Sequence, residues 1–157
     1  MDRIPITPAG FEKLKKELER LKTIERKEVV AAIAEARSHG DLSENAEYDA
    51  AKERQGMIEA RINELEGKIG RFHVIDIATL SGDKIVFGAT VLIENVETEE
   101  QKTYTIVGPD EANVSNGTIS IMSPLARALV NKKVGDEALV IAPGGEIEYE
   151  ILEVSFK

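Results

Sequence analysis

Two stretches of the chain repeat apolar residues at heptad spacing, and a glycine at position 40 separates them. The first stretch has apolar residues three or four positions apart: Phe11, Leu14, Leu18 and Leu21. This repeat shifts register around residues 24–30 and resumes with Ile33 and Ala36. The second stretch has a similar set: Ala51, Ile58, Ile62, Leu65, Ile69 and Phe72. Such spacing places apolar side chains along one helix face, so it predicts two long helices that pack against each other.

The first of these helices has a clear start, because Thr7 can act as its N-cap and Pro8 suits the first helical position. It is expected to run for about thirty residues, which at a rise of about 1.5 Å per residue spans roughly 45 Å. Two such helices joined by a short connection form an antiparallel coiled-coil hairpin. We therefore predict a projecting hairpin over residues 1–76, with its tip at about residues 38–48.

The second half of the chain has a different periodicity, with short β-branched runs separated by turns rich in Gly, Asp and Asn. These runs predict strands, and a segment at 123–131 interrupts them with Ser123 as N-cap and Pro124 at the first helical position. The predicted fold class is therefore α+β: a helical hairpin followed by a small domain, residues 77–157, with a mostly antiparallel sheet. The boundary is expected near residues 76–82.

Charge and composition exclude several classes of protein. The 157 residues have a net charge of −9, of which residues 1–76 contribute −2 and residues 77–157 contribute −7. This balance argues against a protein that binds nucleic acid mainly by neutralising phosphates. With no cysteine, the chain has no disulfide framework and no thiolate metal site. No apolar run approaches the ~20 residues of a membrane span, so we expect a cytoplasmic protein.

The connection between the two helices is rich in carboxylates, which number five: Asp41, Glu44, Glu47, Asp49 and Glu53. One interpretation is helix capping, in which Asp41 accepts hydrogen bonds from the first turn of the second helix and Glu44 reaches back. Capping uses two of the five at most. Like charges three or four residues apart on a helix cost about 0.2–0.5 kcal/mol per pair, so the rest of the charge needs a second explanation.

That second explanation is a hard divalent cation. Carboxylate oxygens suit Mg²⁺, which is usually held by one or two carboxylates together with ligands from elsewhere. Asp41 and Glu44 on an exposed tip would hold the ion weakly, so the free protein is not expected to bind it tightly. A partner's active site could supply the remaining ligands, and the tip would then contribute to a two-metal centre.

The tip stretch IAEARSHGDLSENAEYDAAKERQ, residues 33–55, resembles the tip of the bacterial Gre transcript-cleavage factors. In the second half, VFGATV, IVGPDEA, SPLARALV and APGGEIEYEILEV resemble segments of that family's C-terminal domain, whose fold is similar to that of the FK506-binding proteins. The resemblance covers essentially the full chain. It favours the GreA branch, because a strongly basic hairpin is expected in the GreB branch.

The resemblance implies a transcription elongation factor that binds bacterial RNA polymerase, inserts its hairpin into the secondary channel and stimulates the polymerase's own cleavage of backtracked RNA. Asp41 and Glu44 match the family's acidic pair, which acts in trans and helps hold Mg²⁺ jointly with the polymerase. By position, Arg37, Tyr48 and Lys52 are implied contacts to RNA or to the active site. The implied partners include the RNA 3′ end and DNA of the elongation complex, and we expect a monomer.

Other functions remain open at this point. Inhibitors of the same architecture also enter the polymerase channel, and a coiled-coil adaptor or chaperone would need acidity at the tip only for solubility. A prolyl isomerase is not expected, because that pocket is lined with aromatic side chains, whereas this half has four and the chain has no Trp: Phe87, Tyr104, Tyr149 and Phe156. Of the two histidines, His39 is expected as a favourable cation at a helix C-terminus, and His73 at the end of the second helix.

Overall fold

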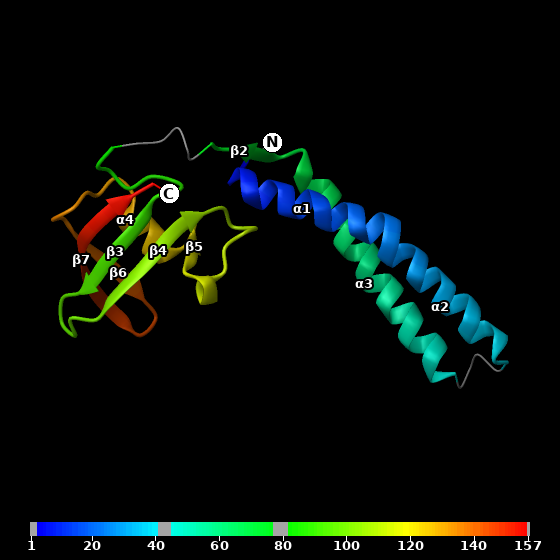
Figure 1. Ribbon diagram of the computed structural model, residues 1–157. Helices are drawn as coiled ribbons and strands as arrows, with labels where there is room; N and C mark the ends of the chain where they lie inside the picture. The colour runs from blue at the N-terminus through cyan, green and yellow to red at the C-terminus, as the bar shows by residue number, and fades with distance from the viewer. Residues whose placement is uncertain (1–2, 41–44, 77–81, 157) are drawn as a thin grey trace. The chain divides into compact units, whose positions relative to one another are not determined.

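The computed structural model describes residues 3–40, 45–76 and 82–156 (Figure 1). The chain divides into two compact units. We call residues 11–72 the hairpin unit, and residues 2–10 together with 73–157 the sheet unit. This is the predicted α+β class, with helices in the first part and a mostly antiparallel sheet in the second. None of the described helices is long and apolar enough to cross a bilayer.

The first arm of the hairpin is helical from Pro8 to Ser38, as α1 (Pro8–Arg20), a five-residue π-helical turn (Leu21–Glu25) and α2 (Arg26–Ser38). The second arm is α3 (Ala46–Ile69), which runs beside the first in Figure 1. The predicted helix of about thirty residues is confirmed. So is its start, because Thr7 Oγ1 accepts a hydrogen bond from the backbone N–H of Gly10 at 3.1 Å.

The π-helical turn explains the register shift that the sequence predicted. On the second arm, Ala51, Ile58 and Leu65 lie seven residues apart and are all buried. On the first arm, the buried residues Leu21 and Val29 are eight apart, one more than a heptad. A π-helical turn accommodates one extra residue, so Val29 returns to the apolar seam.

The second arm ends earlier than the heptad pattern predicted. The helix stops at Ile69, and Phe72 and His73 lie in β2 (Phe72–Val74), so their placement at the helix end was wrong. The helix ends at Gly70, which is its C-cap. Phe72 keeps the apolar spacing although it is not helical, because its ring packs edge to face on Phe11, with ring centroids 6.0 Å apart. Spacing alone does not distinguish such a residue from a helical one.

The sheet unit contains a five-stranded sheet in the order β5-β4-β3-β7-β6. Its strands are β3 (Thr90–Asn95), β4 (Gln101–Val107), β5 (Thr118–Ser120), β6 (Glu137–Ala142) and β7 (Gly145–Ser155). All neighbours are antiparallel except β4 and β5. The helix α4 (Pro124–Leu129) begins at Ser123, whose Oγ accepts from the N–H of Ala126 at 3.2 Å, as predicted.

One side of this sheet and α4 enclose the core of the unit. Its members have at most a few per cent of their surface exposed: Ile85, Ala89, Val91, Ile93, Ile106, Ile119, Ala126, Leu129, Ala138 and Ile151. A second, two-stranded sheet pairs β1 (Ile4–Ile6) with β2. The sheet unit therefore includes the N-terminal strand as well as the second half of the chain.

Glu111 fastens that N-terminal segment within the sheet unit. Its carboxylate accepts hydrogen bonds from the N–H of Thr7 at 2.8 Å, the Thr7 hydroxyl at 2.5 Å and the N–H of Gly108 at 2.9 Å. Thr7 is itself buried. One carboxylate thus holds the residue that caps α1, a role that the sequence did not indicate because Glu111 lies 104 positions away from Thr7.

Candidate functional site at the hairpin tip

The candidate site lies where α2 ends and α3 begins. The acidic pair predicted to act there, Asp41 and Glu44, lies outside the described residues, while both flanks of the tip are described. The described frame of the site consists of the end of α2 at Ser38 and the start of α3 at Ala46. Among the described residues, no group of three or more acidic or histidine side chains is arranged to hold a metal ion.

Asn45 joins the two flanks. Its side-chain oxygen accepts a hydrogen bond from the backbone N–H of Tyr48 at 3.1 Å, which makes Asn45 the N-cap of α3. Its side-chain nitrogen donates to the backbone oxygen of Ala36 in α2 at 2.7 Å. Asn45 thus fills the N-cap position of α3, while the capping interpretation of Asp41 and Glu44 concerns residues outside the described ones. Asparagine is among the best N-caps, whereas the D-x-x-E spacing in the sequence indicated Asp41 as a capping residue.

A second contact across the tip involves His39. This residue is the C-cap of α2, which confirms its predicted place at a helix C-terminus. Its N–H donates to the backbone oxygen of Ala36 at 3.2 Å, and its Nδ1 lies 3.2 Å from Oε2 of Glu47 in the first turn of α3. Gly40 follows with a φ of +105°, a conformation that favours glycine. Glu47, one of the five carboxylates of this stretch, therefore has His39 as a partner at the tip.

The predicted contact residues Arg37, Tyr48 and Lys52 gather on one face next to the tip. The Arg37 guanidinium carbon lies 6.0 Å from the centroid of the Tyr48 ring, at the outer limit of a cation–π contact. Arg37 and Lys52 line the same groove of about 240 Å³, from opposite arms of the hairpin. Lys52 Nζ also donates to Gln55 Oε1 at 3.3 Å. Two cations and an aromatic ring thus flank the acidic stretch.

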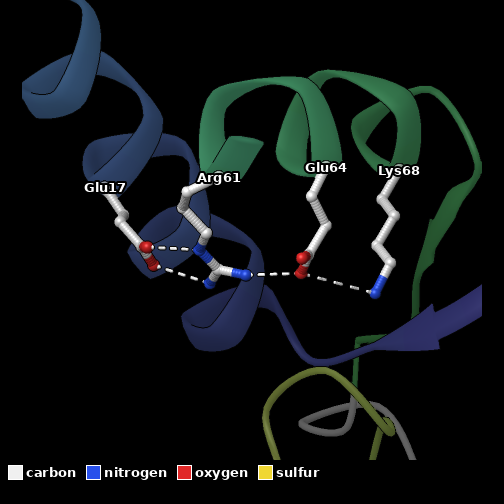
Figure 2. A network of polar contacts seen from close by, with 4 residues as sticks. All are labelled: Glu17, Arg61, Glu64 and Lys68. Carbon is white, nitrogen blue, oxygen red and sulfur yellow. Dashed lines mark hydrogen bonds and ion pairs between the residues drawn. The ribbon is translucent and has the colours of Figure 1, made fainter. Parts of the chain in front are cut away.

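Ion pairs between the arms support the hairpin behind this site. Arg61 of α3 donates two hydrogen bonds to the carboxylate of Glu17 in α1, 2.7 Å and 3.0 Å long, and a third to Glu64 at 2.6 Å. Figure 2 shows this network. Lys68 lies 3.8 Å from the same Glu64. Three more pairs link the arms: Lys22 with Glu66, Arg26 with Glu59, and Glu28 with Arg54. The two arms are therefore linked on the surface as well as through the apolar seam.

These pairs shift the ionisation of their members. Hydrogen bonds from Arg61 hold the pKa of the Glu17 carboxyl below its usual value of 4.5, against the opposing effect of partial burial. Hydrogen bonds from Arg26 likewise lower the pKa of Glu59. The pKa of each guanidinium rises in return. Both carboxylates are therefore ionised, and their pairs with Arg61 and Arg26 are intact, throughout the neutral range.

Comparison with known proteins accounts for both parts of the chain. Residues 4–74 match a family model described as transcription elongation factor, N-terminal, and residues 80–156 match one described as transcription elongation factor, GreA/GreB, C-term. The chain belongs to the GreA/GreB family of transcription elongation factors. The two matched ranges meet close to the predicted domain boundary, and the first contains the whole hairpin.

Individual relatives agree with this membership. The chain is 60% identical to transcription elongation factor GreA of Maricaulis maris over 99% of both chains, and 57% identical to GreA of Caulobacter vibrioides over 99% of both. Among solved structures, it is 30% identical to the GreA factor homolog 1 (Gfh1) protein of Thermus thermophilus, covering 98% of this chain and 99% of that one, with a TM-score of 0.44. The two family models and the two GreA relatives confirm the family resemblance inferred from the tip and C-terminal segments.

Proposed function

We propose that this member of the GreA/GreB family binds bacterial RNA polymerase, inserts its hairpin into the secondary channel and stimulates the polymerase's own cleavage of backtracked RNA, so that arrested complexes resume elongation. The observation that carries the proposal is the tip of the hairpin. A stretch with five carboxylates lies at the end of two long antiparallel helices, in a chain that matches the family over both of its parts. The site of action is the cytoplasm, where bacterial polymerase works.

Asp41 and Glu44 carry the chemistry in this proposal. Both offer hard carboxylate oxygens, which suit Mg²⁺, while the side chains beside them that could compete are engaged: Asn45 with both arms and Glu47 with His39. The pair would hold the ion jointly with ligands of the polymerase. When bound there, Mg²⁺ would supply a Lewis acid that favours ionisation of a water molecule for attack on phosphate.

The described flanks give the tip its other functions. In this proposal Arg37 and Lys52, which line one groove of the hairpin, contact RNA phosphates, and the Tyr48 ring offers a surface on which a base can stack. Asn45 acts on the pair indirectly, because it ties the ends of α2 and α3 on either side of residues 41–44. It is a positioning residue for the tip.

The chain is proposed to work without a catalytic centre of its own. The polymerase remains the enzyme, and the sheet unit serves as a docking domain rather than as a prolyl isomerase. The few aromatic residues of that unit support this division, since Tyr104, Tyr149 and Phe156 pack against its core. Fold likeness alone does not carry an isomerase activity.

The test is a transcript-cleavage assay with purified backtracked elongation complexes and Mg²⁺. The full chain is expected to shorten the RNA and restart elongation, whereas Asp41→Asn and Glu44→Gln should each lower the cleavage rate by about 100-fold or more, as for the loss of other charged transition-state contacts. Glu35→Gln, which removes one exposed carboxylate of α2, is the matched control and should cleave normally.

Thermal melting of the same variants distinguishes this role from a structural one, because the cap of α3 is Asn45 and the two variants should melt like the parent. If the parent slows elongation without shortening RNA, the chain is a channel-binding inhibitor and the proposal fails. Unchanged cleavage by both acidic variants would refute their role in holding the metal.

A further inference from the structure

The outer face of strands β6 and β7 combines exposed apolar side chains with glutamates. Along β6 the side chains alternate: Ala138 and Val140 point into the core, while Leu139 and Ile141 are 46% and 71% exposed. Residues directly opposite in an antiparallel pair project from the same face, and Leu139 lies opposite Glu148 and Ile141 opposite Glu146. On this face, two apolar residues of β6 therefore lie directly beside glutamates of β7.

The charge on this face is not balanced along the strands. Residues 134–156 contain six acidic residues and no Lys or Arg. The sheet register even places three glutamates in one row, because Glu150 of β7 lies opposite both Glu137 of β6 and Glu94 of β3. Like charges directly opposite each other destabilise a sheet. The arrangement has a cost for folding and no structural gain that the strand pairing explains.

A groove of about 330 Å³ lies in the same region. Three strands or their turns line it, with two apolar and three acidic residues: Val96, Glu97, Leu139, Glu146 and Glu148. Val96 is 48% exposed, and its N–H donates to the backbone oxygen of Glu148, which fixes the turn after β3 beside β7. The groove thus combines the apolar side chains of Val96 and Leu139 with three acidic ones.

We propose that this face is a docking site for a partner protein whose segment presents an apolar ridge flanked by Lys or Arg side chains. Apolar contact along Val96, Leu139 and Ile141 would supply affinity, and the glutamates would guide and orient a cationic partner. Positive groups of a partner that lie against the row of glutamates would offset the repulsion within it. This proposal does not depend on transcript cleavage.

Two other occupants fit the face less well. A nucleic acid would bring phosphates against Glu97, Glu146 and Glu148, so repulsion would oppose its binding. A second copy of this chain that used the same patch would place glutamates against glutamates, as a two-fold interface requires. The cationic protein segment is the occupant whose charge complements the groove.

The first test is an NMR titration of the full-length, ¹⁵N-labelled chain with a defined probe. The probe is a 14-residue amphipathic helical peptide built from Leu and Lys, and its counterpart carries Glu in place of Lys. The Leu/Lys peptide is expected to shift the amides of residues 96–97, 137–141 and 146–148, and the Leu/Glu peptide should not. Shifts spread evenly over the acidic surface, or centred on the hairpin, would overturn the proposal.

Variants make this test specific. The pair Glu146→Lys with Glu148→Lys should weaken binding of the Leu/Lys peptide by about tenfold or more, and Leu139→Ser by about threefold or more. Two matched controls lie outside the groove: Glu35→Lys on α2 changes one charge in the same way, and Val114→Ser alters a valine that is 68% exposed. If the controls weaken binding as much as the groove variants, non-specific charge attraction explains the result and the proposal is wrong.

A second test identifies the natural occupant. A photo-crosslinking amino acid at Ile141 of the full-length chain, with the same group at Val114 as control, is activated in bacterial cells and the crosslinked peptides are sequenced by mass spectrometry. The proposal expects a segment in which apolar residues alternate with Lys or Arg. Crosslinks from position 141 to nucleic acid, to a second copy of the chain, or to segments without such cationic residues would each overturn it.

Discussion

The hairpin unit and the sheet unit are stabilised in different ways. In the sheet unit, ten nearly fully buried residues from five strands, α4 and adjacent loops share one core. In the hairpin unit, a narrow apolar seam runs between two arms, and ion pairs such as Glu17 with Arg61 and Arg26 with Glu59 link them at the surface. Each layer of the hairpin therefore depends mainly on its neighbours, whereas each core residue of the sheet depends on many elements at once.

This difference predicts unequal effects of the same change in the two units. Ile93 in β3 is 0% exposed and Ile62 in α3 is 1% exposed, so Ile93→Ala and Ile62→Ala remove equally buried atoms. Both should destabilise their unit by about 2–5 kcal/mol, with Ile93→Ala at the upper end because a core closed on all sides collapses less around a cavity. Amide hydrogen exchange, measured over the whole chain, reports the loss for each unit separately.

The pattern of exchange matters as much as its size. Ile62→Ala should lower protection in α2 and α3 and leave β3, β4 and β7 protected, and Ile93→Ala should do the reverse. Equal loss of protection in both units after either substitution would show that they unfold as one cooperative block, contrary to the comparison.

Glycines offer a second contrast between the units. A Cβ built on Gly108 in the sheet unit would lie 2.0 Å from the backbone oxygen of Pro5, so Gly108→Ala forces the N-terminal strand to move. We expect a loss of about 1–3 kcal/mol, typical of overpacking. Gly67 in α3 has no such neighbour within 4 Å, and Gly67→Ala should stabilise the hairpin by about 0.8–1 kcal/mol because alanine favours a helix interior.

Chemical denaturation followed by circular dichroism at 222 nm checks this pair of variants. The control is Gly56→Ala, a second helical glycine with open space around it, which should behave like Gly67→Ala. A neutral Gly108→Ala would mean that the segment from Ile4 to Thr7 adapts without cost, and that the contact with Glu111 does not restrain it.

The two units also differ in how far sequence predicts them. Heptad spacing predicted both arms of the hairpin and the register shift, and local rules predicted the caps Thr7 and Ser123, because these signals lie within a few residues of their effects. The role of Glu111 was missed, since its hydrogen bonds join residues about a hundred positions apart. The strand β2 was taken for the end of a helix because Phe72 keeps the apolar spacing while it packs on Phe11.

At the candidate site, the structure adds contacts between the two arms that the sequence did not indicate. Arg37, Tyr48 and Lys52 do gather beside the tip. The cap of α3 is Asn45. Its side chain accepts a hydrogen bond from the N–H of Tyr48 in α3 and donates one to the backbone oxygen of Ala36 in α2. No spacing rule within one helix indicates a hydrogen bond to the other helix.

Asn45 therefore allows a smaller and more local test of the hairpin. Asn45→Ala removes the cap and the link to α2, and should lower the stability of the hairpin by about 1 kcal/mol. The earliest sign should be faster amide exchange in the first turn of α3. Asn45→Asp keeps an acceptor for Tyr48 but loses the donor to Ala36, so its exchange should fall between parent and Asn45→Ala. If Asn45→Asp matches the parent, the link between the arms contributes nothing measurable.

The smallest expected effect concerns pH and the ion pairs on the hairpin surface. Because Arg61 lowers the pKa of Glu17 below 4.5 in the folded state, this pair stabilises the hairpin above about pH 4.5, and the stabilisation is lost as the pH falls through the lower, folded-state pKa. The side chains are more than a third exposed, so solvent screens the pair and we expect only about 0.2–1 kcal/mol. The melting temperatures of the parent and of Glu17→Gln should differ at pH 7 and converge toward pH 3.

The same difference should shrink in 1 M salt, because screening weakens exposed pairs. A gap that persists at pH 3 would mean that Glu17 stabilises the hairpin by packing rather than by its charge.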